Sequence, residues 1–186
     1  IRANGALAQR HVTENIDIRN KTDKSGIDII IRAGTVGETV HIPVIISETG
    51  LTDLVYNDFI IGDNADVTIM AGCGIHNCGD KESRHDGIHT FFVGKNAKVK
   101  YIERHYGESD GKEQYTSFSD ASATVYFDRN ALGSKARRVT LQYMKEGAYE
   151  TTIRHVALIK NDGTETESMP SVFWGCEMEM IVVSQD

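Results

Sequence analysis

One internal repeat constrains the fold of this chain more than any other feature of its sequence. Residues 59–69 (FIIGDNADVTI) match residues 91–101 (FFVGKNAKVKY), which begin about 32 positions later. In each segment an apolar stretch leads into a Gly, and a small Ala precedes a second stretch of alternating apolar and polar residues. A single unit of this kind cannot bury its own apolar face, whereas stacked copies bury a continuous core.

The repeat predicts an all-β fold with a right-handed parallel β-helix-like core. We therefore expect Ala65 and Ala97 to point into one shared core, in stacked turns. A shorter third copy is expected at 144–153 (MKEGAYETTI). A β-sandwich that contains two similar hairpins is the alternative. No linker or charge block divides the 186 residues, so a single domain over 1–186 is expected.

Composition narrows the class of function. The formal net charge is −7, and acidic residues outnumber basic ones, which argues against binding to a nucleic-acid backbone. The sequence shows no apolar run long enough to cross a bilayer and no signal peptide, so no membrane span is expected. Three cysteines, an odd number, favour reduced thiols and a cytoplasmic location over a disulfide framework.

The strongest chemical signal lies between residues 71 and 106. Four of the seven histidines and two of the three cysteines fall there. Thiolate and imidazole ligands suit zinc, iron or an iron–sulfur cluster. For each residue, a packing role is the alternative to ligation. The candidate metal ligands are Cys73, His76, Cys78, His85, His89, Glu103 and His105.

Alternation along one strand refines this set. Tyr101, Glu103 and His105 lie two positions apart and share a face. Because Glu and His are expensive to bury unpaired, this face is expected outside the core or at an interface. Cys73 is expected to matter more than Cys176.

Other motifs are absent or uninformative. The chain has no phosphate-binding Gly-rich loop, so it is not expected to hydrolyse ATP by itself. Asp53 and Asp58 are interpreted as acids on solvated turns.

Several segments together resemble the core domain of the SufB/SufD family of iron–sulfur cluster assembly scaffolds. The resemblance is specific over residues 1–112 and weak beyond them, apart from 144–149. The segments that carry it are Ile1–Gly5, Gly26–Ile29, Glu38–Val44, Asp53–Asn57, Ala71–Asn77, His85–His89 and Glu103–Glu108.

The resemblance implies a right-handed β-helix that is a scaffold and not an enzyme. It implies a transient iron–sulfur cluster, or iron, held by Cys73, Glu103 and His105. The implied partners are a SufC-like ABC ATPase, a second copy or a SufB/SufD-type paralogue, and apo client proteins. The helices that dock the ATPase in this family are not found in the sequence. The rival hypothesis is a mononuclear metal-dependent enzyme on a β-helix or cupin-like barrel, with His76, His89, Glu103 and His105 at its site.

Overall fold

The structure, a computed structural model, describes residues 1–77, 81–109, 117–127, 138–145, 168–171 and 176–184. These ranges contain strands and no helix, so the expected all-β content is confirmed there. The strands are β1 (Arg2–Ala3), β2 (Ala6–Leu7), β3 (Ile16–Asn20), β4 (Gly26–Ile31), β5 (Val36–Ile46), β6 (Thr52–Ile61), β7 (Asp66–Asn77), β8 (Ser83–Val93), β9 (Lys98–Ser109), β10 (Ser117–Phe127), β11 (Arg138–Lys145), β12 (Ser168–Ser171) and β13 (Cys176–Val183).

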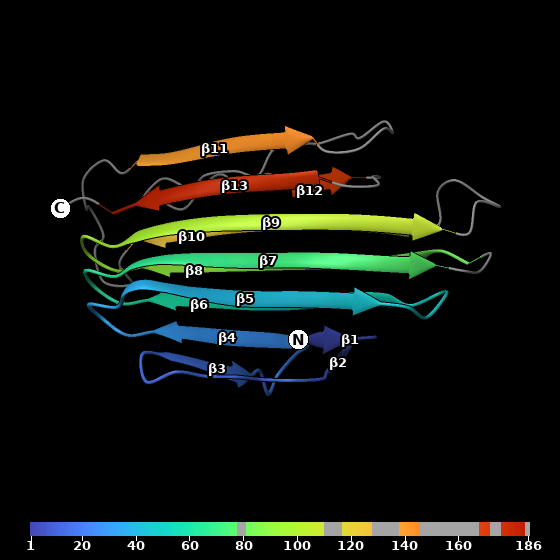
Figure 1. Ribbon diagram of the computed structural model, residues 1–186, viewed down its shortest axis with the longest axis horizontal. Helices are drawn as coiled ribbons and strands as arrows, with labels where there is room; N and C mark the ends of the chain where they lie inside the picture. The colour runs from blue at the N-terminus through green and yellow to red at the C-terminus, as the bar shows by residue number, and fades with distance from the viewer. Residues whose placement is uncertain (78–80, 110–116, 128–137, 146–167, 172–175, 185–186) are drawn as a thin grey trace.

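The described strands form two mixed sheets that lie one behind the other (Figure 1). One has the order β11-β13-β9-β7-β5-β1-β2, and the other has the order β12-β10-β8-β6-β4-β3. From β4 to β10, consecutive strands alternate between the sheets. Each strand from β4 to β8 pairs in parallel with the strand two places further along the chain. We call β4–β5, β6–β7 and β8–β9 the first, second and third units.

The turns inside the units explain the repeat in the sequence. Asn64 and Asn96 adopt positive φ angles of 58° and 53°, and Gly34 holds the equivalent place with φ 75°. Asn tolerates this left-handed conformation better than most residues. The amide of Gly34 donates to Asp63 O at 2.8 Å, and that of Asn64 donates to Lys95 O at 2.7 Å. The turns therefore stack one upon the next.

Glycine is required where one turn lies against another. A Cβ atom at Gly62 would lie 2.3 Å from the backbone nitrogen of Ala33, and one at Gly94 would lie 2.5 Å from Asp63 Oδ1. Both contacts are too short for any larger residue, so these two glycines allow the close approach of successive units.

The predicted stacking of the two copies is confirmed. Ala65 and Ala97 are almost fully buried in a single apolar cluster, and Thr35 occupies the equivalent buried place in the first unit. Of the expected third copy, residues 146–153 lie outside the described residues. Its first two residues end β11, which pairs antiparallel with β13. This pairing differs from the parallel stacking of the other copies.

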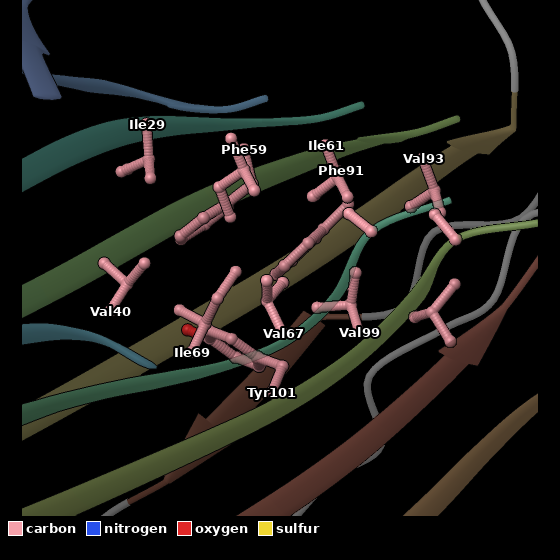
Figure 2. Close-up of a cluster of buried hydrophobic side chains, with 14 of the residues drawn as sticks. Ile29, Val40, Phe59, Ile61, Val67, Ile69, Phe91, Val93, Val99 and Tyr101 are labelled. Atoms are coloured by element: carbon pink, nitrogen blue, oxygen red, sulfur yellow. The ribbon is translucent and has the colours of Figure 1, made fainter. Parts of the chain in front are cut away.

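Apolar side chains in register fill the space between the sheets near these turns (Figure 2). Phe59 and Phe91 stack with ring centroids 4.4 Å apart, and Tyr101 meets Phe91 edge to face at 5.0 Å. Ile29 precedes the two phenylalanines in the same line across the sheet. This end of the interior is a continuous hydrophobic core.

Candidate functional site

Further from the turns, the interior changes from apolar to polar along the stack of units. In one sheet, Ile27 of the first unit is in register with Asn57 and then with His89. In the other sheet the same change occurs in two adjacent lines across β5, β7 and β9. These lines are Ile42, Ala71 and Glu103, and Val44, Cys73 and His105. We call Asn57, Cys73, His89, Tyr101, Glu103 and His105 the polar cluster.

Glu103 is the centre of the polar cluster. The hydroxyl of Tyr101 donates to its Oε2 at 3.0 Å. Its Oε1 lies 2.9 Å from Nε2 of His105 and 3.5 Å from Nε2 of His89. The two imidazoles come from different sheets, since β9 carries His105 and β8 carries His89. Three side chains thus converge on one buried carboxylate.

The expectation that this face lies outside the core or at an interface is wrong. Tyr101, Glu103 and His105 are 0%, 3% and 2% exposed within a single chain. Burial alone raises the pKa of Glu103, but His105 and His89 outweigh it and hold that pKa well below its ordinary value. Paired in this way, the carboxylate can be buried in its charged form.

His89 is held in place from two sides. A Cβ atom at Gly87 would lie 2.7 Å from Nε2 of His89, so the imidazole fits only over a glycine. On the other side, Nδ1 of His89 lies 3.4 Å from Nδ2 of Asn57, whose Oδ1 accepts a hydrogen bond from the amide of Ile27. The position of the ring is therefore fixed by its neighbours.

Cys73 lies next to His105 in the register of β7 and β9. It is a free cysteine with 2% exposure, packed with Val44, Ile46 and Ile75. Burial, together with the charges of Asp53 and Glu103, raises the pKa of its thiol. Cys73 is therefore a neutral thiol in this arrangement, and a nearby cation is needed to make it a thiolate.

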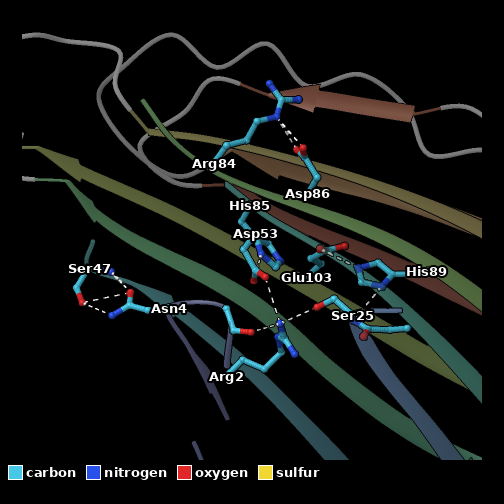
Figure 3. Close-up of polar contacts among 12 residues, drawn as sticks. Arg2, Asn4, Ser25, Ser47, Asp53, Arg84, His85, Asp86, His89 and Glu103 are labelled. Atoms are coloured by element: carbon cyan, nitrogen blue, oxygen red, sulfur yellow. Dashed lines mark hydrogen bonds and ion pairs between the residues drawn. The ribbon is translucent and has the colours of Figure 1, made fainter. Parts of the chain in front are cut away.

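A second group of buried charges lies beside the polar cluster (Figure 3). Nη2 of Arg2 lies 3.1 Å from Oδ1 of Asp53, and Nδ1 of His85 lies 3.2 Å from Oδ2 of the same carboxylate. Arg2 also donates to the hydroxyl of Ser25. We call Arg2, Ser25, Asp53 and His85 the Arg2 network.

The Arg2 network contradicts the prediction that Asp53 lies on a solvated turn, and it contains residues that the sequence did not assign to a site. Asp53 is 5% exposed and is not an acid on a solvated turn. Burial raises its pKa, but hydrogen bonding to His85 and the charges of His85 and Arg2 lower it overall. Arg2, Asn57 and Asp53 were not predicted as site residues, because their partners are distant in the sequence.

The structure brings together some of the predicted ligands and separates others. Cys73, His89, Glu103 and His105 share the polar cluster. His85 belongs to the Arg2 network. His76 is exposed on the opposite face of β7 from Cys73, so the full ligand set of the rival enzyme does not meet. Cys78 lies outside the described residues.

The donor atoms suit iron by type, but they contact one another. Within the described ranges, no group of three or more His, Cys, Asp or Glu side chains is arranged to hold a metal ion. Glu103 and His105 instead form a pair. Binding of a metal would require this pair to open.

The chain was also compared with known proteins. No family model, no curated protein and no solved structure matches it. In the part of the chain that the structure describes, no helix is both long and apolar enough to cross a membrane.

Proposed function

We propose that this chain is a scaffold on which a nascent iron–sulfur cluster is assembled and then passed to client proteins. One observation carries the proposal: a thiol, a carboxylate and two imidazoles from three consecutive strands, β7, β8 and β9, meet in the buried space between the two sheets. In this role the cluster is cargo, and Cys73, His89, Glu103 and His105 are the residues that hold it. Mixed sulfur, nitrogen and oxygen donors of this kind suit iron.

The contacts among these residues support transient binding. Without cargo, the charge of Glu103 is compensated by His89 and His105. Loading requires Glu103 and His105 to exchange their mutual contact for contacts to iron. Release restores the original pair, so no unpaired buried charge is left behind. A site that is stable in both states can give up its cargo more readily than a site built only to retain it.

Iron also offers a way to activate Cys73. The raised pKa of its thiol means that the sulfur is protonated when the site is empty. A ferrous ion bound at Glu103 and His105 would supply the positive charge that favours the thiolate, because metal binding releases the proton of a ligating thiol. Iron and sulfur ligation are then coupled, with the carboxylate and imidazole binding first.

The proposal also extends to the architecture of the core. We propose that the core is a right-handed parallel β-helix, as in the SufB/SufD family. The alternation of strands between two sheets, with parallel pairing two places along the chain, supports it. We further propose a cytoplasmic location, in agreement with the free thiol of Cys73.

The proposed partners follow from what the sequence lacks. It contains no phosphate-binding Gly-rich loop, so any dependence on ATP enters through a separate SufC-like ABC ATPase. A second copy of the chain, or a SufB/SufD-type paralogue, completes the scaffold, and apo client proteins receive the cluster. The chain itself is not proposed to be an enzyme.

Anaerobic reconstitution with ferrous iron and sulfide tests the proposal. The parent protein is expected to retain iron and sulfide together after desalting and to show broad visible charge-transfer absorption. Cys73→Ser should abolish this retention, whereas Glu103→Gln and His105→Asn should weaken it. His41→Asn, at an exposed position on β5, is the matched control and should behave as the parent.

Two results would count against the scaffold. Equal retention by Cys73→Ser and the parent would make Cys73 a packing residue. Stoichiometric binding of zinc without any retention of sulfide would favour a mononuclear metal enzyme instead.

A further inference from the structure

Asn57 connects the backbone of a neighbouring strand to a histidine of the polar cluster. It lies on β6, in register with Ile27 of β4 on one side and with His89 of β8 on the other, and it is 3% exposed. The amide of Ile27 can only donate, so the atom of Asn57 that faces it at 3.2 Å is the carbonyl oxygen Oδ1. The amino group of Asn57 therefore faces Nδ1 of His89, at 3.4 Å.

This orientation decides which ring nitrogen of His89 carries the proton. The amino group of Asn57 has hydrogens to donate and no lone pair to offer, so Nδ1 of His89 must be the acceptor. A neutral imidazole carries one proton, which is then on Nε2. Nε2 lies 3.5 Å from Oε1 of Glu103, so this proton is available to the carboxylate (Figure 3). A series of donors thus runs from the amide of Ile27 through Asn57 and His89 to Glu103.

The packing of His89 keeps Nδ1 opposite Asn57. A Cβ atom at Gly87 would lie 3.0 Å from Cε1 of His89, in addition to its close approach to Nε2. The ring of Phe59 meets the imidazole edge to face with centroids 5.9 Å apart, and the ring of Tyr101 lies at the same distance. The imidazole is enclosed by these neighbours, so it cannot turn away from the amino group.

The position of the proton matters for metal binding. Histidine ligates a metal through an unprotonated ring nitrogen and donates the proton of its other nitrogen to a neighbouring acceptor. In His89 the nitrogen nearest Glu103 is the protonated one. Ligation through Nε2 would need the proton to move to Nδ1 and the carboxamide of Asn57 to reverse. The amino group of Asn57 would then face the amide of Ile27, and that buried amide would lose its acceptor.

We propose that Asn57 is a positioning residue that fixes the tautomer of His89: His89 donates to Glu103 in the empty site and ligates iron only when the carboxamide of Asn57 reverses. The tautomer follows from the contacts of Asn57, whereas its consequence for iron rests on the proposed scaffold function. Because reversal leaves the amide of Ile27 unpaired, Asn57 opposes ligation by His89 and favours release of the cargo.

Nitrogen-15 NMR of the metal-free chain with labelled histidines measures the tautomer. At about pH 8, above the ordinary pKa of histidine, we expect Nε2 of His89 to be protonated and Nδ1 to be unprotonated. Loss of these signals in His89→Gln assigns them. In Asn57→Asp, which is of nearly equal size, both carboxylate oxygens accept. Nδ1 should then become protonated, while the amide of Ile27 keeps its partner.

Asn77→Asp is the matched control for these spectra. Asn77 is also buried, and its amino group donates to the backbone oxygen of Lys81, so the signals of His89 should match those of the parent. A protonated Nδ1 in the parent, or an unprotonated Nδ1 in Asn57→Asp, would overturn the assignment. The spectrum of the parent decides by itself if Asn57→Asp does not fold.

Binding of ferrous iron alone, measured anaerobically by competition with a chelator, tests the consequence for loading. Asn57→Asp should bind iron roughly tenfold more tightly than the parent, because no amide is left unpaired when His89 ligates. The double variant Asn57→Asp/His89→Gln should lose this gain, which separates ligation by His89 from the attraction of an added charge. No gain in Asn57→Asp, or an equal gain in the double variant, would overturn the role of Asn57 in loading. Failure of the parent to bind iron would instead refute the proposed function, and the spectra would still decide the tautomer.

Discussion

The interior between the sheets changes character along the length of its strands. We call the part near the turns the apolar end, and the part further along the strands, which holds the polar cluster, the polar end. Near the turns, equivalent positions remain apolar from unit to unit, as in Ile29, Phe59 and Phe91. A few residues away on β8 and β9, the equivalents of apolar residues in the first unit become His89, Glu103 and His105. Stacked units are stabilised by the apolar surface that neighbouring units bury against each other, and most of it lies near the turns. The polar end is thus free to carry chemistry, while the apolar end stabilises the stack.

The largest effect is expected at the apolar end. Phe91→Ala removes a fully buried ring that stacks on Phe59, and it should lower the free energy of unfolding by about 4 kcal/mol. Phe92→Ala is the matched control, because Phe92 lies on the outer face of β8 and is only half-buried. Urea denaturation of both variants measures the difference. Similar losses in the two would show that the apolar end does not hold the stack together.

The polar end should respond to acid. The pKa of Glu103 is lower in the folded chain than its ordinary value, so its ionisation stabilises the fold above the unfolded-state pKa, near 4.3. That stability is lost as the pH falls from there through the folded pKa. Glu103→Gln should therefore cost about 3 kcal/mol at neutral pH, and the difference from the parent should shrink in acid.

Unfolding midpoints in urea, measured from neutral to acidic pH, test this expectation. Asp53 contributes with the same sign, because its pKa is also lowered, so the variant should keep part of the acid sensitivity. A difference between variant and parent that grows towards low pH would contradict the pairing of Glu103 with its histidines.

The smallest effect is expected at the turns. Asn96 has a φ of 53°, and Asn96→Ala should cost about 1 kcal/mol because a Cβ without a polar side chain disfavours this conformation. Asn96→Gly should be close to neutral. Thermal unfolding compares the two variants. Equal destabilisation by Ala and Gly would point to the side-chain amide of Asn96, which contacts Asn64, as the important feature.

The sequence predicted the stacked turns because Gly, Asn and Ala recur at positions that the backbone requires. It did not reveal the equivalent turn of the first unit, where Gly34 and Thr35 replace the Asn and the Ala. The residue types of the polar cluster indicated possible metal ligands. The sequence did not indicate that these residues are buried. Glu103 is compensated partly by His89, which belongs to the other sheet, and no pattern within a single strand shows that partner.

The Arg2 network shows even more clearly that contacts between residues distant in the sequence cannot be read from the sequence. Arg2 and Asp53 form an ion pair across 51 positions of sequence. Each residue alone resembles an ordinary surface charge, and only the fold places them together. A single sequence therefore predicts repeats well and shows which residues could take part in a site. Which buried charges pair with each other depends on the tertiary structure.

The central claim is that the polar end serves binding and the apolar end serves stability. The most direct test replaces His89, Glu103 and His105 together with Leu, which makes the third unit as apolar as the first. Replacing buried ion pairs by apolar residues is often neutral or stabilising. The account predicts a variant that is at least as stable in urea as the parent and retains no iron or sulfide after anaerobic reconstitution. A folded variant that still retains both would contradict it, as would a variant whose unfolding shows that these residues hold the fold together.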